Sequence, residues 1–163
     1  NKCMNIAVNT NQISTQNLYL LDSKNNIIMN NGKFTKINYV HDFFTMNGIY
    51  ILFPIHNFVF EQHDTKKAIK FQFQHINNHV PLHDLIKLEQ KILDFYSSNK
   101  CKDYKKSLLL KKQLESGFMK VYRENNIPLP NHHVKYLLKI SGVWETNNEI
   151  GITYKLFECN SIK

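Results

Sequence analysis

Apolar and polar residues alternate with a period of two in two neighbouring segments, residues 134–140 and 150–157. One side of the first segment carries Val134, Tyr136, Leu138 and Ile140, and the other carries Lys135 and Lys139. In the second segment, Ile150, Ile152, Tyr154 and Leu156 alternate with Thr153, Lys155 and Phe157. A polar connector, Glu145 to Glu149, joins the segments, and Trp144 lies where the first one ends. The pattern predicts a β-hairpin with one apolar and one lysine-bearing face.

Short apolar runs upstream predict further strands. These are Leu18–Leu21, Ile27–Met29, Phe34–Val40, Ile49–Phe53, Phe58–Phe60, Ala68–Gln74 and Phe118–Arg123. Asn-Gly pairs at residues 31–32 and 47–48 indicate tight turns, because Asn and Gly tolerate positive φ angles. The segment Asp22–Asn26 is expected to connect the first two strands, and His63–Lys66 to close a hairpin.

Two helical segments are predicted in the middle of the chain. The first begins near Pro81, carries an apolar stripe at 3.6-residue spacing and ends at residues 97–99. The second spans Asp103–Ser116 and stops at Gly117. The prediction is therefore a mainly β chain of the α+β class: an N-terminal arm at 1–16, then one domain at 17–163 with a helical insertion at about 81–116. Asn125–Pro130 is expected to be a rigid linker into the hairpin.

The positive net charge of the chain indicates a polyanionic partner, either nucleic acid or an acidic membrane surface. The formal net charge is +8 and the isoelectric point is about 9.3. All basic residues but Arg123 are lysines, and asparagine is abundant, so part of the charge can reflect an A+T-rich genome. Guanine is usually recognised by the guanidinium fork of arginine. Binding through lysines would instead neutralise phosphates with little sequence preference.

The basic residues gather between Lys100 and Arg123, where the net charge is +6. Lys105, Lys106, Lys120 and Arg123 lie in this stretch together with Tyr104 and Tyr122. A basic patch with interleaved aromatic residues is typical of nucleic-acid binders. A solvated helix face explains the same pattern, and a core hairpin with solvated lysines explains the hairpin of residues 134–157; both alternatives stay open at this point.

Signals for catalysis or a cofactor are absent from the sequence. It has no Gly-rich phosphate loop, nucleophile elbow or HExxH motif, so we predict neither an enzyme nor a cofactor. His75, His79 and His83 would share one face of a continuous helix, but Pro81 and the Asn pair at 77–78 argue against such a helix, so no metal site is predicted. Three widely spaced cysteines indicate a reducing intracellular compartment, and no apolar run reaches transmembrane length.

A resemblance covers the terminal hairpin. Residues 134–156 resemble the closing hairpin of the podophage-type single-stranded DNA-binding proteins, which have counterparts in nucleocytoplasmic large DNA viruses. The matching positions are Trp144, Thr146, Gly151, Lys155 and Leu156, whereas Gly142 stands where that family has an aromatic residue. Upstream, Asn47–Phe53 followed by a long helix resembles the family's strand-then-helix insertion. The resemblance implies an OB-like antiparallel barrel with one or two helices between strands.

The resulting expectation is a sequence-tolerant single-stranded DNA-binding protein of replication or repair, with DNA favoured over RNA as the ligand. Lys135, Lys139, Lys155 and Lys120 would neutralise phosphates, while Trp144 and Tyr122 would stack bases. Arg123, Lys105 and Lys106 complete the expected contact set. Replication proteins and a second copy of the chain are further candidate partners, and the nucleus, cytoplasm, viral factory or virion the candidate locations. The alternative function is a small structural or assembly protein of a virion or other large complex.

Overall fold

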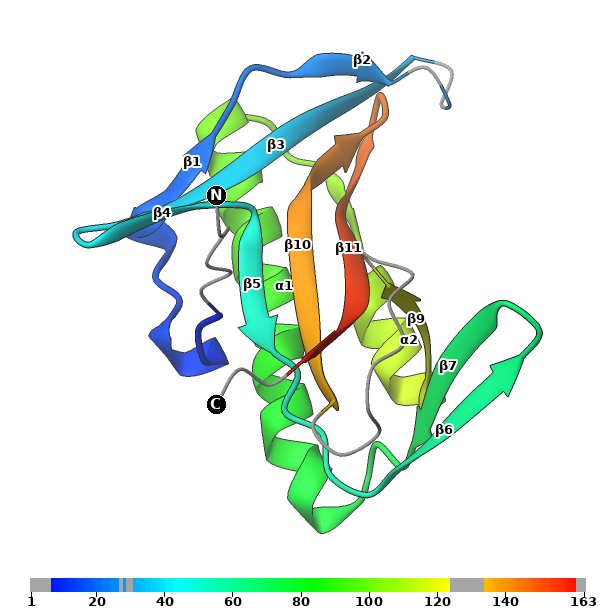
Figure 1. Cartoon of the computed structure of the whole chain (residues 1–163). Coiled ribbons are helices and arrows are strands. Elements are labelled where there is room, and N and C mark those ends of the chain that lie inside the picture. Colours follow the sequence, from blue (N-terminus) through cyan, green and yellow to red (C-terminus); the bar gives the residue numbers. More distant parts are fainter. Residues whose placement is uncertain (1–6, 27, 29–30, 124–133, 161–163) are drawn as a thin grey trace.

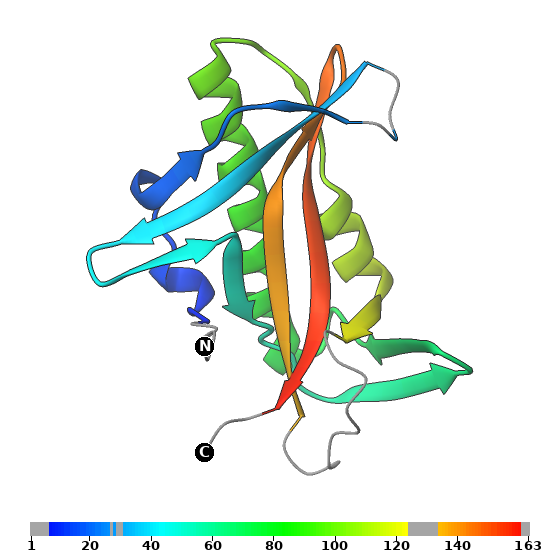
Figure 2. The same ribbon diagram turned by 45° about the horizontal axis from the view of Figure 1, so that its top comes forward.

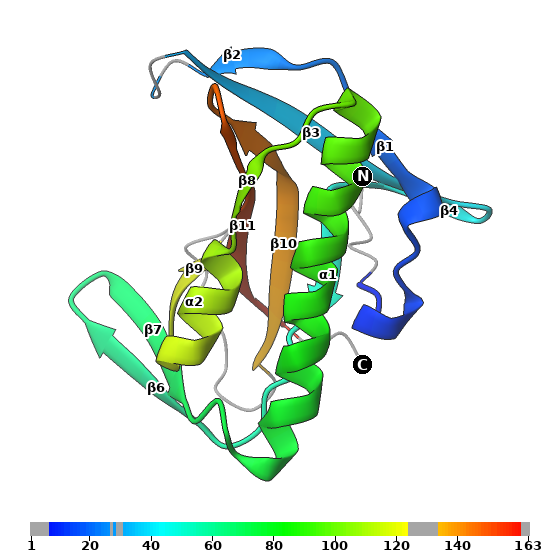
Figure 3. The same ribbon diagram turned by 180° about the vertical axis from the view of Figure 1, so that it is seen from behind.

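A bent antiparallel-rich sheet with two helices on one of its sides forms the protein. The computed structural model describes residues 7–26, 28, 31–123 and 134–160. Figure 1 shows the side of the sheet that neither helix covers, and Figure 3 shows α1 and α2 lying across the opposite side. The predicted α+β class, mainly β with a helical insertion, is confirmed.

The strands before the first α-helix are β1 (Leu18–Leu20), β2 (Lys24–Asn26), β3 (Gly32–His41), β4 (Phe44–Asn47), β5 (Ile49–Leu52), β6 (Phe58–His63) and β7 (Lys66–Phe71). The helix α1 (Ile76–Lys100) follows, then β8 (Lys105–Ser107), α2 (Leu109–Ser116), β9 (Phe118–Arg123), β10 (Val134–Glu145) and β11 (Glu149–Asn160). Two short 3-10 helices, Thr10–Gln12 and Thr15–Asn17, precede β1.

The predicted hairpin of β10 and β11 lies at the centre of the sheet. The main strand order is β1-β3-β10-β11-β9-β7-β6. Strand β10 pairs with β3 near one end and with β5 near the other, while β8 and β9 run parallel to β11 along its far edge. The path ends at β1 and β6, which do not pair with each other, so the described strands leave the sheet open. Figure 2 shows the hairpin in front of both helices.

A bulge at Ser141 controls which residues of β10 face the helices. Ile140 pairs with Tyr154 and Gly142 with Thr153, so Ser141 is an extra residue without a partner on β11. Strict alternation would otherwise turn Trp144 to the core side. With the extra residue, Val143 points inward and is fully buried, and Trp144 points to the side that has no helix.

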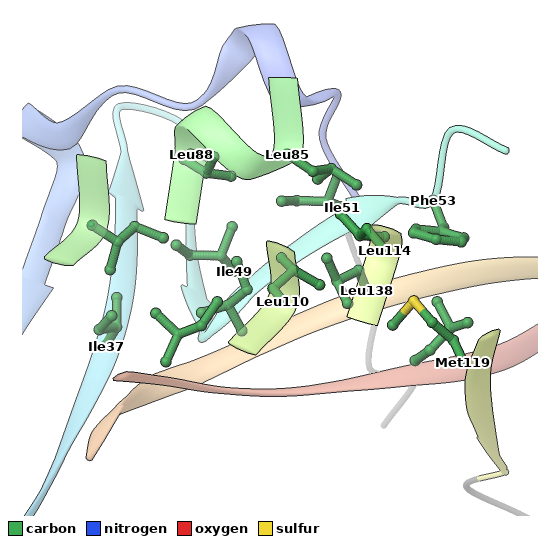
Figure 4. Packing of buried hydrophobic residues seen from close by; sticks show 14 of the residues in the cluster. Ile37, Ile49, Ile51, Phe53, Leu85, Leu88, Leu110, Leu114, Met119 and Leu138 are labelled. Carbon is green, nitrogen blue, oxygen red and sulfur yellow. The ribbon is translucent and has the colours of Figure 1, made fainter. Parts of the chain in front are cut away.

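The core lies between the inward face of this sheet and the two helices. Leu85 and Leu88 of α1 meet Ile49 and Ile51 of β5, while α2 contributes Leu110 and Leu114 (Figure 4). Leu138, Ile140, Ile150, Ile152 and Leu156 are buried on the same side, as the alternation of the hairpin predicts. Neither described helix is long and apolar enough to cross a membrane.

The first helix begins earlier than predicted, at Ile76 rather than near Pro81. The side chain of His75 caps it by accepting from the Asn77 amide. Asn78 is fully buried, and its side chain bonds the backbone of His56 in both directions, at 2.7 and 2.9 Å. These contacts fix the extra turn although Pro81 cannot donate a backbone hydrogen bond there.

Three other predicted elements differ from the structure. The expected helix Asp103–Ser116 is divided into β8 and α2, because residues 105–107 pair with β11. The expected connector Asp22–Asn26 contains β2, whereas Ile27 and Met29 of the expected strand lie outside the described residues, as does Asn125–Pro130. Within the expected arm, Val8 bonds the carbonyl of Tyr50 at 2.9 Å, so this part of the arm joins the sheet edge.

A buried carboxylate holds α2 against α1. Helix α2 has no side-chain cap of its own; instead both carboxylate oxygens of Glu89, on α1, accept from the amides of Leu110 and Lys111 at 2.9 Å. Burial raises the pKa of Glu89 above its usual 4.5, although these two hydrogen bonds act in the opposite direction. The folded state therefore binds a proton at this carboxylate more readily than the unfolded chain does.

This shift predicts a pH-dependent stability term. As pH rises through the interval between 4.5 and the raised folded pKa, the free energy of unfolding should fall, because the folded state must give up a proton it favours. In Glu89→Gln this term disappears, so the stability of the variant relative to wild type should improve across that interval. Urea unfolding from pH 4.5 upward checks this, with exposed Glu115→Gln as control. A difference independent of pH would contradict it.

Candidate nucleic-acid interface

Lysines gather on the side of the sheet away from α1 and α2, which we call the open face. In the hairpin its outward positions include Lys135, Lys139 and Trp144 on β10, and Thr153, Lys155 and Phe157 on β11. Lys139 lies directly opposite Lys155 across the two strands. Like charges at directly opposed positions destabilise a sheet. The arrangement is therefore unfavourable for folding and suited to an anion lying over the hairpin.

Each of these opposed lysines leans over a tyrosine on the neighbouring strand. Lys139 Nζ lies 5.3 Å from the ring centre of Tyr50 on β5, and Lys155 Nζ lies 4.9 Å from that of Tyr122 on β9. Lys120 Nζ is also over Tyr122, at 4.7 Å. Cation–π contacts of this kind hold the ammonium groups near the aromatic surface. Four of the residues expected from the sequence, Lys120, Tyr122, Lys139 and Lys155, thus belong to one continuous surface.

Trp144 lies on the same face and rests on a glycine. A Cβ added to Gly151 would come within 2.4 Å of the indole, so the ring lies directly over the β11 backbone. On the other side of β10, Phe34 of β3 pairs with Trp144, and its ring covers Gly142. The absence of side chains at Gly142 and Gly151 therefore lets two aromatic rings lie flat on the strands at one end of the open face.

Two of the three carboxylates of β10 and β11, those of Glu145 and Glu158, point away from the open face. In the described segments 134–145 and 150–159 the acidic residues are Glu145 and Glu158, and both face the helix side. Glu145 Oε2 accepts from Tyr96 at 3.1 Å, and its other oxygen accepts from Tyr104. Burial, together with this carboxylate, raises the pKa of both tyrosines above the usual 10, so their hydroxyls stay protonated donors into the alkaline range. The open face of these segments consequently keeps an unopposed positive charge.

Glu158 is held at the opposite end of the hairpin. Lys67 Nζ lies 3.3 Å from its carboxylate, and both side chains are largely buried. Tyr136, which pairs with Glu158 in the register, has its pKa raised to about 12 by burial and by this carboxylate. The same inward side thus accommodates both negative groups that β10 and β11 contain between residues 134–145 and 150–159.

The remaining expected residues are not brought together with the open face. Lys106 forms an ion pair with Asp94 of α1, and Lys105 and Lys106 line a groove of about 310 Å³ beside α2. Arg123 pairs in register with the inward-facing Glu158, and its Nε is buried without a hydrogen-bond partner among the described residues. The basic segment Lys100–Arg123 is therefore divided between two sides of the molecule: Lys106 and Arg123 face the helix side, whereas Lys120 and Tyr122 reach the open face.

Several open-face residues were missed by sequence reasoning. Phe34, Lys36 and Tyr50 join the surface because β3 and β5 pair with β10. Phe157, which the alternation had already placed on this face, packs beside Tyr122 with ring centres 6.2 Å apart. No local pattern indicates these long-range pairings. The signal that was available and unused is the Ser141–Gly142 pair inside an alternating strand, a common mark of a bulge.

The histidines do not form a metal centre in the described part of the chain. Contrary to expectation, α1 is continuous past Pro81, so His79 and His83 do share a face, with ring centres 4.4 Å apart. His75, however, caps the helix. No group of three histidine, cysteine, aspartate or glutamate side chains among the described residues is placed to bind a metal ion.

No protein-family model, no curated protein and no solved structure matches this chain. A functional assignment therefore depends on the geometry of the open face and on the residues that form it.

The contact between the Trp144 indole and Gly151 gives a direct structural prediction. Gly151→Ala should push the indole away from β11 and expose it, because the new Cβ would overlap the ring. The tryptophan emission maximum should then shift to longer wavelength, with a loss of stability of about 1–3 kcal/mol. Thr153→Ala, two residues along the same face, is the matched control. Unchanged emission in Gly151→Ala would show that the indole lies elsewhere.

Proposed function

We propose that this protein binds single-stranded DNA, with little sequence preference, across the open face. The observation that carries the proposal is the opposed pair Lys139 and Lys155, each held over a tyrosine on a surface that also presents Trp144. Single-strand binding requires positive charge along a path for phosphates and aromatic rings on which bases stack. Both requirements are met on one face, and the carboxylates of Glu145 and Glu158 point away from it.

We further propose an architecture for the sheet and a cellular process for the protein. We infer an OB-like arrangement modified by an open sheet, supported by the long helix between strands and by the central hairpin. Stacking on an open sheet does not require barrel closure, since single strands also bind across open sheets in other folds. Lysines dominate the face, which favours sequence-tolerant binding to phosphates over reading of base edges. A role in DNA replication or repair, including that of a virus, follows from this ligand.

One titration tests the proposal. Labelled oligo-dT and a duplex of the same length are titrated at two salt concentrations, with anisotropy and Trp144 fluorescence followed together. Single strands should bind more tightly, should quench Trp144, and should weaken linearly on a log–log plot of affinity against salt. Failure to bind single strands at low salt would overturn the proposal.

The opposed lysines predict effects of opposite sign on stability and binding. Lys155→Thr removes the like-charge repulsion with Lys139 and adds a β-branched residue, so stability should rise by about 0.2–1 kcal/mol. Binding to oligo-dT should weaken, and the salt slope should decrease by about 0.7 if one phosphate contact is lost. Lys91→Ala, an exposed charge loss on α1, should leave the slope unchanged. A normal slope in Lys155→Thr would exclude this lysine from the interface.

Trp144→Ala should weaken single-strand binding by about 1–3 kcal/mol, the usual contribution of a base stacked on an aromatic ring. The circular dichroism spectrum should remain that of the folded protein, because the indole lies on the open face rather than in the core. Loss of the folded spectrum would show that Trp144 supports the fold, and the stacking role would then be lost.

A second candidate function, a structural or assembly component, is favoured by the edge strand β6. It ends the sheet path and exposes Phe58, Val59 and Phe60. An apolar edge with unpaired backbone groups can add a strand from another chain. Association through such an edge would respond weakly to salt, whereas binding of nucleic acid would respond strongly. Sedimentation of the protein without DNA, at low and high salt, separates the two.

A further inference from the structure

A hollow of about 350 Å³ lies beside Tyr122, where the open face continues onto the hairpin of β6 and β7. Its lining comes from three strands: Glu61 and His63 of β6, Lys66, Lys67 and Ala68 of β7, and Phe118 and Lys120 of β9. Ala68 pairs with Lys120 on one side and with Glu61 on the other, so these three side chains share one face of the sheet. Lys120 in turn leans over Tyr122, which joins the hollow to the open face.

The hollow exists because a small residue sits among long ones. Ala68 contributes only a methyl group, while the flanking positions in its row carry Glu61 and Lys120. Phe118, two residues before Lys120 on β9, forms a wall and is 42% exposed. An aromatic ring this exposed at the edge of a hollow offers surface on which a planar ligand can stack, and it contributes less to the core than a buried ring would.

Charge decides which part of a nucleotide fits. Glu61 places a carboxylate in the lining, oriented by Lys70 at 3.0 Å, and a carboxylate repels phosphate. The methyl group of Ala68 and the ring of Phe118 provide apolar surface, whereas Lys66 and Lys120 supply positive charge to the same lining. A base in the hollow would lie against the apolar surface of Ala68 and Phe118, and its neighbouring phosphates would lie at the lysines.

We propose that this hollow takes a base of the bound single strand, stacked on Phe118, as a second anchoring point beyond Trp144 and Tyr122. The inference rests on the proposed function and extends it to the path of the ligand. From β10 to β7 the strand crosses three strand intervals of about 4.8 Å each. The DNA therefore runs across the strands from the hairpin of β10 and β11 toward the hairpin of β6 and β7.

Oligonucleotide length separates this second anchor from the first. Oligo-dT of about four to about sixteen nucleotides, the range of site sizes in single-strand-binding domains, is titrated against wild type, Ala68→Leu and Phe118→Ala. Leucine fills the hollow, and alanine removes its stacking wall. Both variants should bind the longest oligomers about tenfold more weakly than wild type, while the shortest oligomers bind all three proteins equally. Quenching of Trp144 should be retained throughout.

Thr45→Leu, an exposed strand residue on β4 at the other end of the sheet, controls for added apolar surface and should match wild type at every length. Phe118→Ala keeps the test valid if Ala68→Leu unfolds, because Phe118 is partly exposed already. If wild type binds single strands but neither variant shows a length-dependent loss, the hollow is not part of the path and the proposed function remains. If wild type binds no single strand, both inferences fail.

Discussion

The extra residue at Ser141 is the constraint on which the two faces of the sheet depend. Before the bulge, Leu138 and Ile140 point to the helices. After it, Val143 points to the helices, and Gly142 and Trp144 lie on the open face. The bulge thus keeps an unbroken apolar stripe under α1 and α2 while reversing the direction of the residues that follow. Without it, Trp144 would compete for core space, and Glu145 would lie among the lysines.

Separating charge by sheet face has energetic consequences on both sides. On the helix side, Glu145 is stabilised by hydroxyl donors from Tyr96 and Tyr104, which tie α1 and the segment before β8 to β10. On the open side, Lys139 and Lys155 face each other without a carboxylate between them. A sheet optimised only for stability would place opposite charges in such a pair. The unfavourable pairing supports a role for this face in binding an anion.

The sequence predicts local periodicity well and long-range pairing poorly. Alternation in residues 134–140 and 150–157 identified the faces of the hairpin, because one buried side imposes a strict period of two. It did not identify the bulge at Ser141. Alternation alone would place Trp144 on the core side of the sheet, whereas the bulge turns it to the open face. Pro81 suggested a helix start, but the buried hydrogen bonds of Asn78 override that local preference. Tyr50 reaches the open face only through pairing of β5 with β10, which no nearby residue signals.

The central position of β10 and β11 also determines the order in which the sheet can be completed. Strands β3 and β5 have β10 as a neighbour, and β8 and β9 have β11, so each waits for residues beyond 133 to be synthesised. Until then their edges remain open to other chains, and the contacts that close the core span long stretches of sequence. Folding of this protein should therefore be slow, and a nascent chain that ends before residue 134 should be prone to association through these unpaired strand edges.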